Sequence, residues 1–444
     1  MSQRTCTLED LKRADANFFD LRHAESETVT MTVPAAAGGT IKKVSAIALE
    51  PDIRPHWLPD GSFRLPIVPA APPALPEGRL LARFRDSGAP AAVASGSAVH
   101  FAFDPVETLR GLLRERYVGA SRPAVSGLPF HYHRFPRSMR LWAHRLQVRR
   151  SAVEDEGFPA WPVEPSAEAL RRLLRAGFEA AAGKPLPSHG SLWPGGKRFA
   201  VVLSHDMDTA KSFAAMDNLA KMEEARGLRS CWNVVGAFYR HDHAALGAIS
   251  SAGHEIALHG YNHDNKLAYL PGAEIEKRLD SCAGFANRYG VQGFRSPSLL
   301  TSAALDAAVA RRFVWSSSTI DTDVNSIIAP HRGVCSVFPF FKDGLLELPL
   351  TIPLDDRLMI MGFRGDAFFE LVMKKTDWIA KVGGVVFLGN HPEPHISGNA
   401  EMLAMYERLL DALAARGDAW FALPSELARH WRDTLNVPWR QESL

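Results

Sequence analysis

The sequence predicts an α/β protein: a distorted (β/α) barrel of about seven parallel strands, preceded by an N-terminal mixed α/β region. After about residue 197, short apolar runs typical of buried strands alternate with amphipathic helical segments. Repeated strand–helix units form parallel sheets with right-handed crossovers, and about seven units can close a barrel. Proline and glycine cluster over residues 184–197. We therefore divide the chain into an accessory region, 1–190, and a barrel domain, 191–444.

Composition and charge are those of an ordinary globular protein. The chain is 46% apolar and 23% charged, and its net charge of +2 gives no global field that would attract nucleic acid. The four cysteines form no CxxC pair, which argues against a thiolate zinc site. Cys231 and Cys282 lie in apolar surroundings typical of buried free thiols. The N-terminus has no basic segment followed by an apolar run, so we expect a cytoplasmic location.

The accessory region is predicted to combine short strands with helices. Turn residues separate four β-like runs, and two of the helices have recognisable starts: Pro105 in a first turn and Ser166 as a cap. The expected strands cover 27–34, 42–49, 62–68 and 97–103, and the expected helices cover 8–22, 105–117 and 166–182.

The segment 134–150 is rich in arginine and has an apolar stripe at helical spacing. One interpretation is a surface helix that packs its stripe on the domain and leaves its arginines in solvent. The alternative is peripheral membrane contact, or contact with an anionic substrate, through the same helix. The surface-helix interpretation is the favoured one, because such patterns are common on amphipathic helices.

The barrel domain is predicted to contain seven strands, with helices between most of them. The expected strands cover 199–205, 230–236, 254–260, 291–295, 313–317, 345–350 and 385–390. The clearest intervening helices cover 209–226, 241–252, 271–289 and 302–311.

Acidic, basic and imidazole side chains follow four of these strands at the point where each one ends. Because the reactive groups of such barrels lie where strands end and loops begin, we expect these side chains to converge on one rim. They are His205, Asp206 and Asp208 after the first strand, His259 and His263 after the third, Arg295 after the fourth and His391 after the seventh.

Three of these residues suit a hydrolytic metal site. Two histidines spaced as His259 and His263 can point the same way on a helical turn, and a carboxylate from another strand, Asp206 or Asp208, completes a set of three ligands. Strand alternation puts Asp206 on the same side as Asp208, so that one can ligate and the other can take a proton. Taken singly, the histidine pair could be a helix surface and the Asp-x-Asp a turn or a helix cap.

Five motifs in order resemble the polysaccharide deacetylases, carbohydrate esterase family four. The resemblance covers roughly residues 197–425, and the first motif is similar to the branch of that family with His-Asp-x-Asp. The motifs are SHDMD (204–208), HEIALHGYNH (254–263), GFRSPS (293–298), LELPLT (346–351) and VVFLGNHPEPH (385–395).

Carried over position by position, the resemblance implies a divalent metal, for which we expect zinc, held by Asp208, His259 and His263. Asp206 matches the base that takes a proton from the metal-bound water as that water attacks. Arg295 matches the arginine that orients this base.

The remaining implied roles concern the leaving group and the oxyanion. His391 matches the acid that protonates the departing amine, and the backbone N–H of Ser298 matches an oxyanion donor. The sequence also departs from the family, because Ser298 stands where an aromatic residue is usual. The family also has a motif, its fourth, that is normally an Asp near a Trp and is none of the five segments above. Its aspartate is assigned either to Asp321 or to Asp323.

The resemblance implies an enzyme that removes an N-acetyl group from a sugar or polysaccharide, with an N-acetylated sugar or glycan as its substrate. One alternative is a C–N hydrolase that acts on a non-sugar linear or cyclic amide. A second alternative is a non-catalytic deacetylase-like protein that binds glycan. The sequence does not indicate an oligomeric state.

Overall fold

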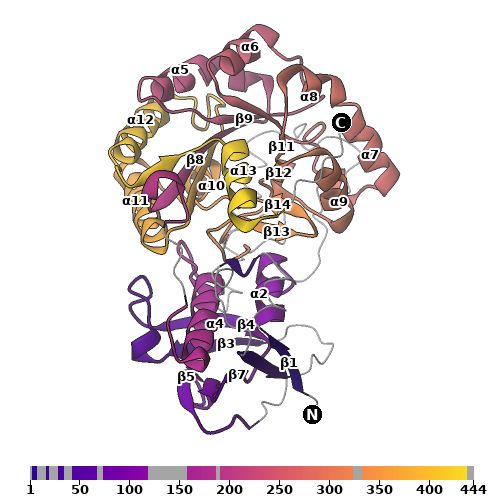
Figure 1. Cartoon of the computed structure of the whole chain (residues 1–444). Coiled ribbons are helices and arrows are strands. Elements are labelled where there is room, and N and C mark those ends of the chain that lie inside the picture. Colours follow the sequence, from indigo (N-terminus) through magenta and orange to yellow (C-terminus); the bar gives the residue numbers. More distant parts are fainter. Residues whose placement is uncertain are drawn as a thin grey trace. The chain divides into compact units, whose positions relative to one another are not determined.

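A computed structural model describes eight stretches of the chain, and within them the chain forms two compact units (Figure 1). Of the described residues, unit 1 comprises those within 3–118, 158–186 and 333–336, and unit 2 comprises 191–323 and 337–437. The predicted basic segment 134–150 lies outside the described residues, as does most of the predicted helix 8–22. The described stretches are 3–7, 17–19, 29–34, 43–67, 74–118, 158–186, 191–323 and 333–437.

Unit 1 is built on a seven-stranded sheet in the order β1-β2-β7-β6-β5-β3-β4. Every pairing is antiparallel except that of β2 with β7. The helix α4 (Ser166–Ala182) packs on β5, β6 and β7 and buries its leucine stripe there. The other elements are β1 (Gln3–Thr7), β2 (Thr30–Pro34), β3 (Lys43–Leu49), β4 (Ser62–Ile67), β5 (Arg79–Phe84), β6 (Pro90–Ser95), β7 (Ala98–Phe101) and α2 (Pro105–Leu113).

Both predicted helices of unit 1 that fall on described residues are present. Asp104 caps α2 by accepting from two backbone N–H groups of its first turn. Ser166 is the first residue of α4 rather than its cap, and its hydroxyl bonds to the carbonyl of Arg64. The prediction missed β1, β5 and β6. Three of the six residues of β6 are alanines, and alanine has low strand propensity.

Unit 2 is built on a nine-stranded sheet in the order β13-β14-β12-β11-β10-β9-β8-β15, with β16 also on β8. All neighbours are parallel except β13, which forms an antiparallel hairpin with β14. The strands are β8 (Phe199–Met207), β9 (Cys231–Val234), β10 (Glu255–Leu258), β11 (Gly293–Phe294), β12 (Trp315–Ser316), β13 (Phe340–Lys342), β14 (Leu345–Glu347), β15 (Val385–Asn390) and β16 (Ala419–Phe421).

The mixed α/β class is confirmed, and the sheet of unit 2 is strongly curled. The backbone N–H groups of Thr351 and Ile352, just past β14, both donate to the carbonyl of Phe387 in β15. The segment that follows β14, near one end of the strand order, is thus hydrogen-bonded to β15 at the other end. The expected set of about seven parallel strands is not reproduced as such, because the sheet has two further strands. Asp343-Gly344 makes a tight turn that adds the antiparallel strand β13, and β16 pairs with β8.

Helices surround the sheet of unit 2 (Figure 1). The expected helix 271–289 is two helices, α7 and α8, and the last four helices were not predicted individually. No helix among the described residues is long and apolar enough to cross a membrane. The helices are α5 (Phe213–Glu224), α6 (His243–Ser251), α7 (Gly272–Asp280), α8 (Ala283–Tyr289), α9 (Ala303–Arg312), α10 (Asp355–Met361), α11 (Gly365–Val382), α12 (Ala400–Ala414) and α13 (Pro424–Leu435).

Candidate metal centre

The end of β8 presents alternate residues to two different environments. Ser204 and Asp206 face Arg295, and Asp208 continues on that side. His205 points to the opposite face, where its Nε2 lies 2.7 Å from Glu223 of α5. His205 therefore belongs to a buried contact between sheet and helices and not to the rim, although its place at the strand end suggested the rim.

His259 and His263 come together through a tight loop, not through the helical turn that their spacing suggested. His259 follows β10, and the chain then reverses through left-handed conformations at Gly260 (φ 63°) and His263 (φ 54°). A Cβ at Gly260 would lie 2.5 Å from Cδ of Pro297, so only glycine fits there without a shift. The two imidazoles end with their ring centroids 5.1 Å apart.

Asp208, His259 and His263 form a group that could hold a metal ion. The Nε2 atoms of both histidines lie 3.1 Å from Oδ1 of Asp208, and one ligand atom from each residue falls within 4.8 Å of the others. His259 donates from Nδ1 to the carbonyl of Arg295 at 3.0 Å, so Nε2 is the ring nitrogen that could ligate a metal. Two imidazole nitrogens and one carboxylate are a donor set that suits zinc and keeps a position open.

The surroundings of Asp208 strongly stabilise its ionised form. Burial alone would raise the pKa of this carboxyl, but the charge of His263 and hydrogen bonds from both histidines hold the pKa well below its ordinary value. The pKa of His263 is correspondingly raised, since Asp208 outweighs the opposing effect of burial. This mutual stabilisation shows a carboxylate and two ring nitrogens that are already oriented toward one another.

Asp206 is held separately, by an arginine. Oδ1 of Asp206 accepts from Arg295 at 2.7 Å and from Asn233 of β9 at 2.8 Å. Arg295 is completely buried and is fixed further by Ser204 and Ser317. Burial would raise the pKa of Asp206, but the guanidinium charge lowers it below the ordinary value. The described hydrogen bonds occupy only Oδ1, so Oδ2 is the oxygen left for a proton.

His391 is held by a carboxylate that the sequence analysis did not single out. Its Nδ1 lies 2.6 Å from Oδ1 of Asp355, and its backbone N–H donates to Oδ2 at 2.7 Å. Ser397 also donates to Oδ2. Burial would lower the pKa of His391, but Asp355 raises it well above the ordinary value. The Nε2 atom faces Asp208 Oδ2 at 4.0 Å, which brings His391 into the same site.

The other predicted residues have mixed outcomes. Ser298 lies in the turn Pro297–Leu299 just after Arg295, and its hydroxyl donates to Asn265. Asp321 bonds to the buried Lys375 of α11 at 2.8 Å. Asp321 and Asp323 stay alternative predictions for the fourth-motif aspartate.

A second buried carboxylate, Glu393, lies close to the centre and was also missed. Its Oε1 accepts from the backbone and hydroxyl of Thr209 and from Ser212. Burial and then the charge of Asp208 raise the pKa of Glu393 to about 7. Only its place two residues after His391 could have drawn attention to it in the sequence.

No protein-family model matches this chain, and no curated protein matches it. Solved structures similar to it include polysaccharide deacetylases and family 4 carbohydrate esterases. A Mycobacterium smegmatis protein assigned as a polysaccharide deacetylase is 23% identical, with 58% of this chain and 98% of that chain covered and a TM-score of 0.46. A Pseudomonas aeruginosa PAO1 protein with the same assignment is 19% identical, with 57% and 97% covered and a TM-score of 0.44. Puue allantoinase is also 19% identical, with 56% and 94% covered and a TM-score of 0.45.

Proposed function

We propose that this chain is a metal-dependent hydrolase that removes an N-acetyl group from a sugar or polysaccharide. The observation that carries the proposal is the meeting of His259 and His263 with Asp208, each at 3.1 Å. Amide hydrolysis needs a polarised carbonyl, a base for the attacking water and an acid for the leaving nitrogen. Asp206 and His391, each held by a different partner, supply the second and third of these needs.

A divalent metal, for which we choose zinc, would be held by Asp208, His259 and His263 and would supply Lewis acidity toward the carbonyl and toward water. Asp206 is the base. Its ion pair with Arg295 keeps it ionised, and its Oδ2 accepts the proton of the attacking water. The buried guanidinium also prevents rotation of the carboxylate, because Oδ1 is held at 2.7 Å.

His391 is the acid. Asp355 favours the imidazolium form and fixes the ring through Nδ1, so that Nε2–H points to the site and can protonate the departing nitrogen. The backbone N–H of Ser298 serves as a donor to the oxyanion, beside the metal group. The products are acetate and a protonated amine. One water is consumed, and the proton that Asp206 takes up offsets the proton that His391 gives, so atoms and charge balance.

Acetate release tests this proposal directly. Zinc- or cobalt-supplemented protein is assayed on N-acetylhexosamines and N-acetylchito-oligosaccharides. We expect wild type to release acetate, and Asp206→Asn to lose activity by roughly 10²- to 10⁴-fold while it retains metal, because Asp206 lies outside the metal group. Asp217→Asn, on exposed α5 surface, is the matched control. Absence of acetate from every sugar, or an active Asp206→Asn variant, would contradict the proposal.

The second candidate is a C–N hydrolase that acts on a small cyclic or linear amide. It is favoured by Ser298, because a hydroxyl bonded to Asn265 stands where the resemblance implies an aromatic groove wall. Allantoin in the same assay separates the two candidates. A protein that only binds glycan would release no acetate, and its glycan affinity would be unaffected by Asp206→Asn.

A further inference from the structure

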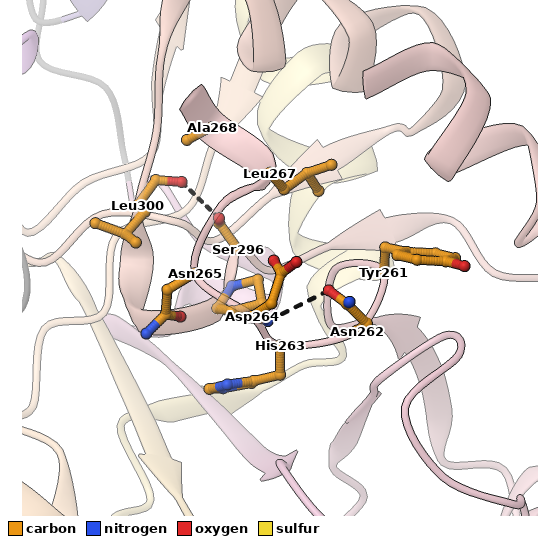
Figure 2. A pocket seen from close by; sticks show the side chains of 10 residues that line it. Tyr261, Asn262, His263, Asp264, Asn265, Leu267, Ala268, Ser296 and Leu300 are labelled. Atoms are coloured by element: carbon orange, nitrogen blue, oxygen red, sulfur yellow. Dashed lines mark hydrogen bonds between the residues drawn. The ribbon is translucent and has the colours of Figure 1, made fainter. Parts of the chain in front are cut away.

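A small pocket adjoins the metal group on one side of His263 (Figure 2). Its cavity volume is about 10 Å³, which is room for one water-sized group, such as a hydroxyl or carbonyl oxygen, rather than for a sugar ring. Apolar and polar side chains both line it, and Asn265 is one of the polar ones. The lining residues are Tyr261, Asn262, His263, Asp264, Asn265, Leu267, Ala268, Ser296, Pro297 and Leu300.

Asn265 brings an unused hydrogen-bond donor to this pocket. The residue is only 3% exposed, and its Nδ2 finds no acceptor among the described residues. Its Oδ1 is occupied, since Ser298 Oγ donates to it at 3.2 Å. Figure 2 shows the side chains of Asn265 and His263 extending toward the same side of their loop, whereas Tyr261 extends the other way. A buried donor without a partner is costly, so this amide calls for an acceptor.

The backbone around Asn265 is constrained in a way that fixes this amide. Asn265 (φ 59°) and Ser298 (φ 52°) are both in the left-handed region, as is His263 (φ 54°). Such conformations are costly for residues other than glycine and concentrate at ligand sites. The bond between Ser298 and Asn265 joins the loop after β10 to the turn after β11. It therefore directs Nδ2 away from Ser298.

We propose that Asn265 is a specificity-determining residue, which donates a hydrogen bond from Nδ2 to an acceptor oxygen on the substituent bound in this pocket. This inference rests on the proposed hydrolase function. The acceptor is a hydroxyl oxygen if the substrate is a sugar, and a second carbonyl oxygen if it is a ureide. Because the pocket takes only a small group, a substrate without an acceptor oxygen at this position leaves the amide unpaired and is disfavoured.

The test is binding observed at the amide itself. Zinc-supplemented protein labelled with ¹⁵N-asparagine is titrated with N-acetylglucosamine, with allantoin and with N-butylacetamide, which has no acceptor beyond its amide carbonyl. The side-chain signal of Asn265 is identified by its loss in Asn265→Asp, a variant that keeps the shape and the acceptor of the side chain. Asn287→Leu, on the exposed surface of α8, is the control.

We expect N-acetylglucosamine or allantoin, but not N-butylacetamide, to shift the Asn265 signal. Asn265→Asp and Asn265→Leu should weaken binding of the active probe at least about tenfold, and Asn287→Leu should leave it unchanged. The proposal is overturned if no probe shifts the signal, if N-butylacetamide shifts it equally, or if both Asn265 variants bind normally. Loss of the proposed function would show differently, as a wild-type protein that holds no metal and cleaves no amide.

Discussion

At the residue scale, three titratable groups of the site each have a different charged or imidazole partner. Asp206 is fixed by Arg295, Asp208 by two histidines, and His391 by Asp355. These partners push the pKa values in opposite directions, downward for the two carboxyls and upward for His391. Groups whose environments separate their pKa values in this way can act as base and acid at one pH.

Asp355→Asn tests the assignment of the acid. The side-chain carbonyl of the substituted asparagine could still accept from Nδ1 of His391, but it would lack the negative charge that favours imidazolium, so the pKa of His391 should fall. Because the acid must be protonated to act, the alkaline limb of the kcat profile against pH should move to lower pH, and kcat at neutral pH should decrease roughly tenfold or more. Asp366→Asn, whose side chain is 79% exposed on α11, is the control.

An alkaline limb that stays in place in Asp355→Asn would show that His391 does not act as the acid, even if kcat falls.

The site residues predicted from the sequence were those that follow strands, because a strand end fixes position within a parallel sheet. Asp355 was missed since it follows no regular strand, and it reaches His391 over 36 positions through the start of α10. Asn265 was missed for another reason. It stands out only because its Nδ2 has no hydrogen-bond partner among the described residues, and hydrogen-bond partners cannot be predicted from the sequence.

At the scale of elements, the loop between β10 and the short helical turn Leu267–Tyr269 carries both histidines. The HxxxH spacing suggested a helical turn, but Gly260 reverses the chain, so that both histidines reach Asp208 from a loop. The physical reason is the close approach of Pro297, which lies against Gly260. The spacing predicted that the two side chains would lie together, which they do, but it predicted a helical turn, which is wrong. A helical turn and this loop both bring residues four apart together.

Gly260→Ala tests that explanation. The new methyl would meet Pro297 Cδ at 2.5 Å and would require a left-handed alanine, so we expect a loss of about 1–3 kcal/mol in the free energy of unfolding and weaker metal binding. Gly247→Ala is the matched control: it lies within α6 with open space around its Cβ, and should be stabilising by about 0.5–1 kcal/mol. Denaturant unfolding measures both variants, and equal effects would contradict the role given to Gly260.

For the whole molecule, sequence reasoning succeeded best where apolar strands alternate with helices, because burial on both faces makes such strands conspicuous. It succeeded less well in unit 1, where β1, β5 and β6 were not predicted. The sequence of β6 is rich in alanine, which has low strand propensity. It gave no sign that residues 333–336 cluster with unit 1, because nothing local in sequence marks a short segment that joins a distant part of the chain.

The central claim is that Asp208, His259 and His263 hold a divalent metal, and metal content tests it most directly. Wild type, His259→Ala and His263→Ala are purified, supplemented with zinc, desalted and analysed by plasma mass spectrometry. Asp206→Asn and His391→Ala serve as site variants outside the metal group. We expect about one equivalent in wild type and in these two controls, and a small fraction of that in the histidine variants. A wild type that retains no metal, or histidine variants that retain as much as wild type, would contradict the account.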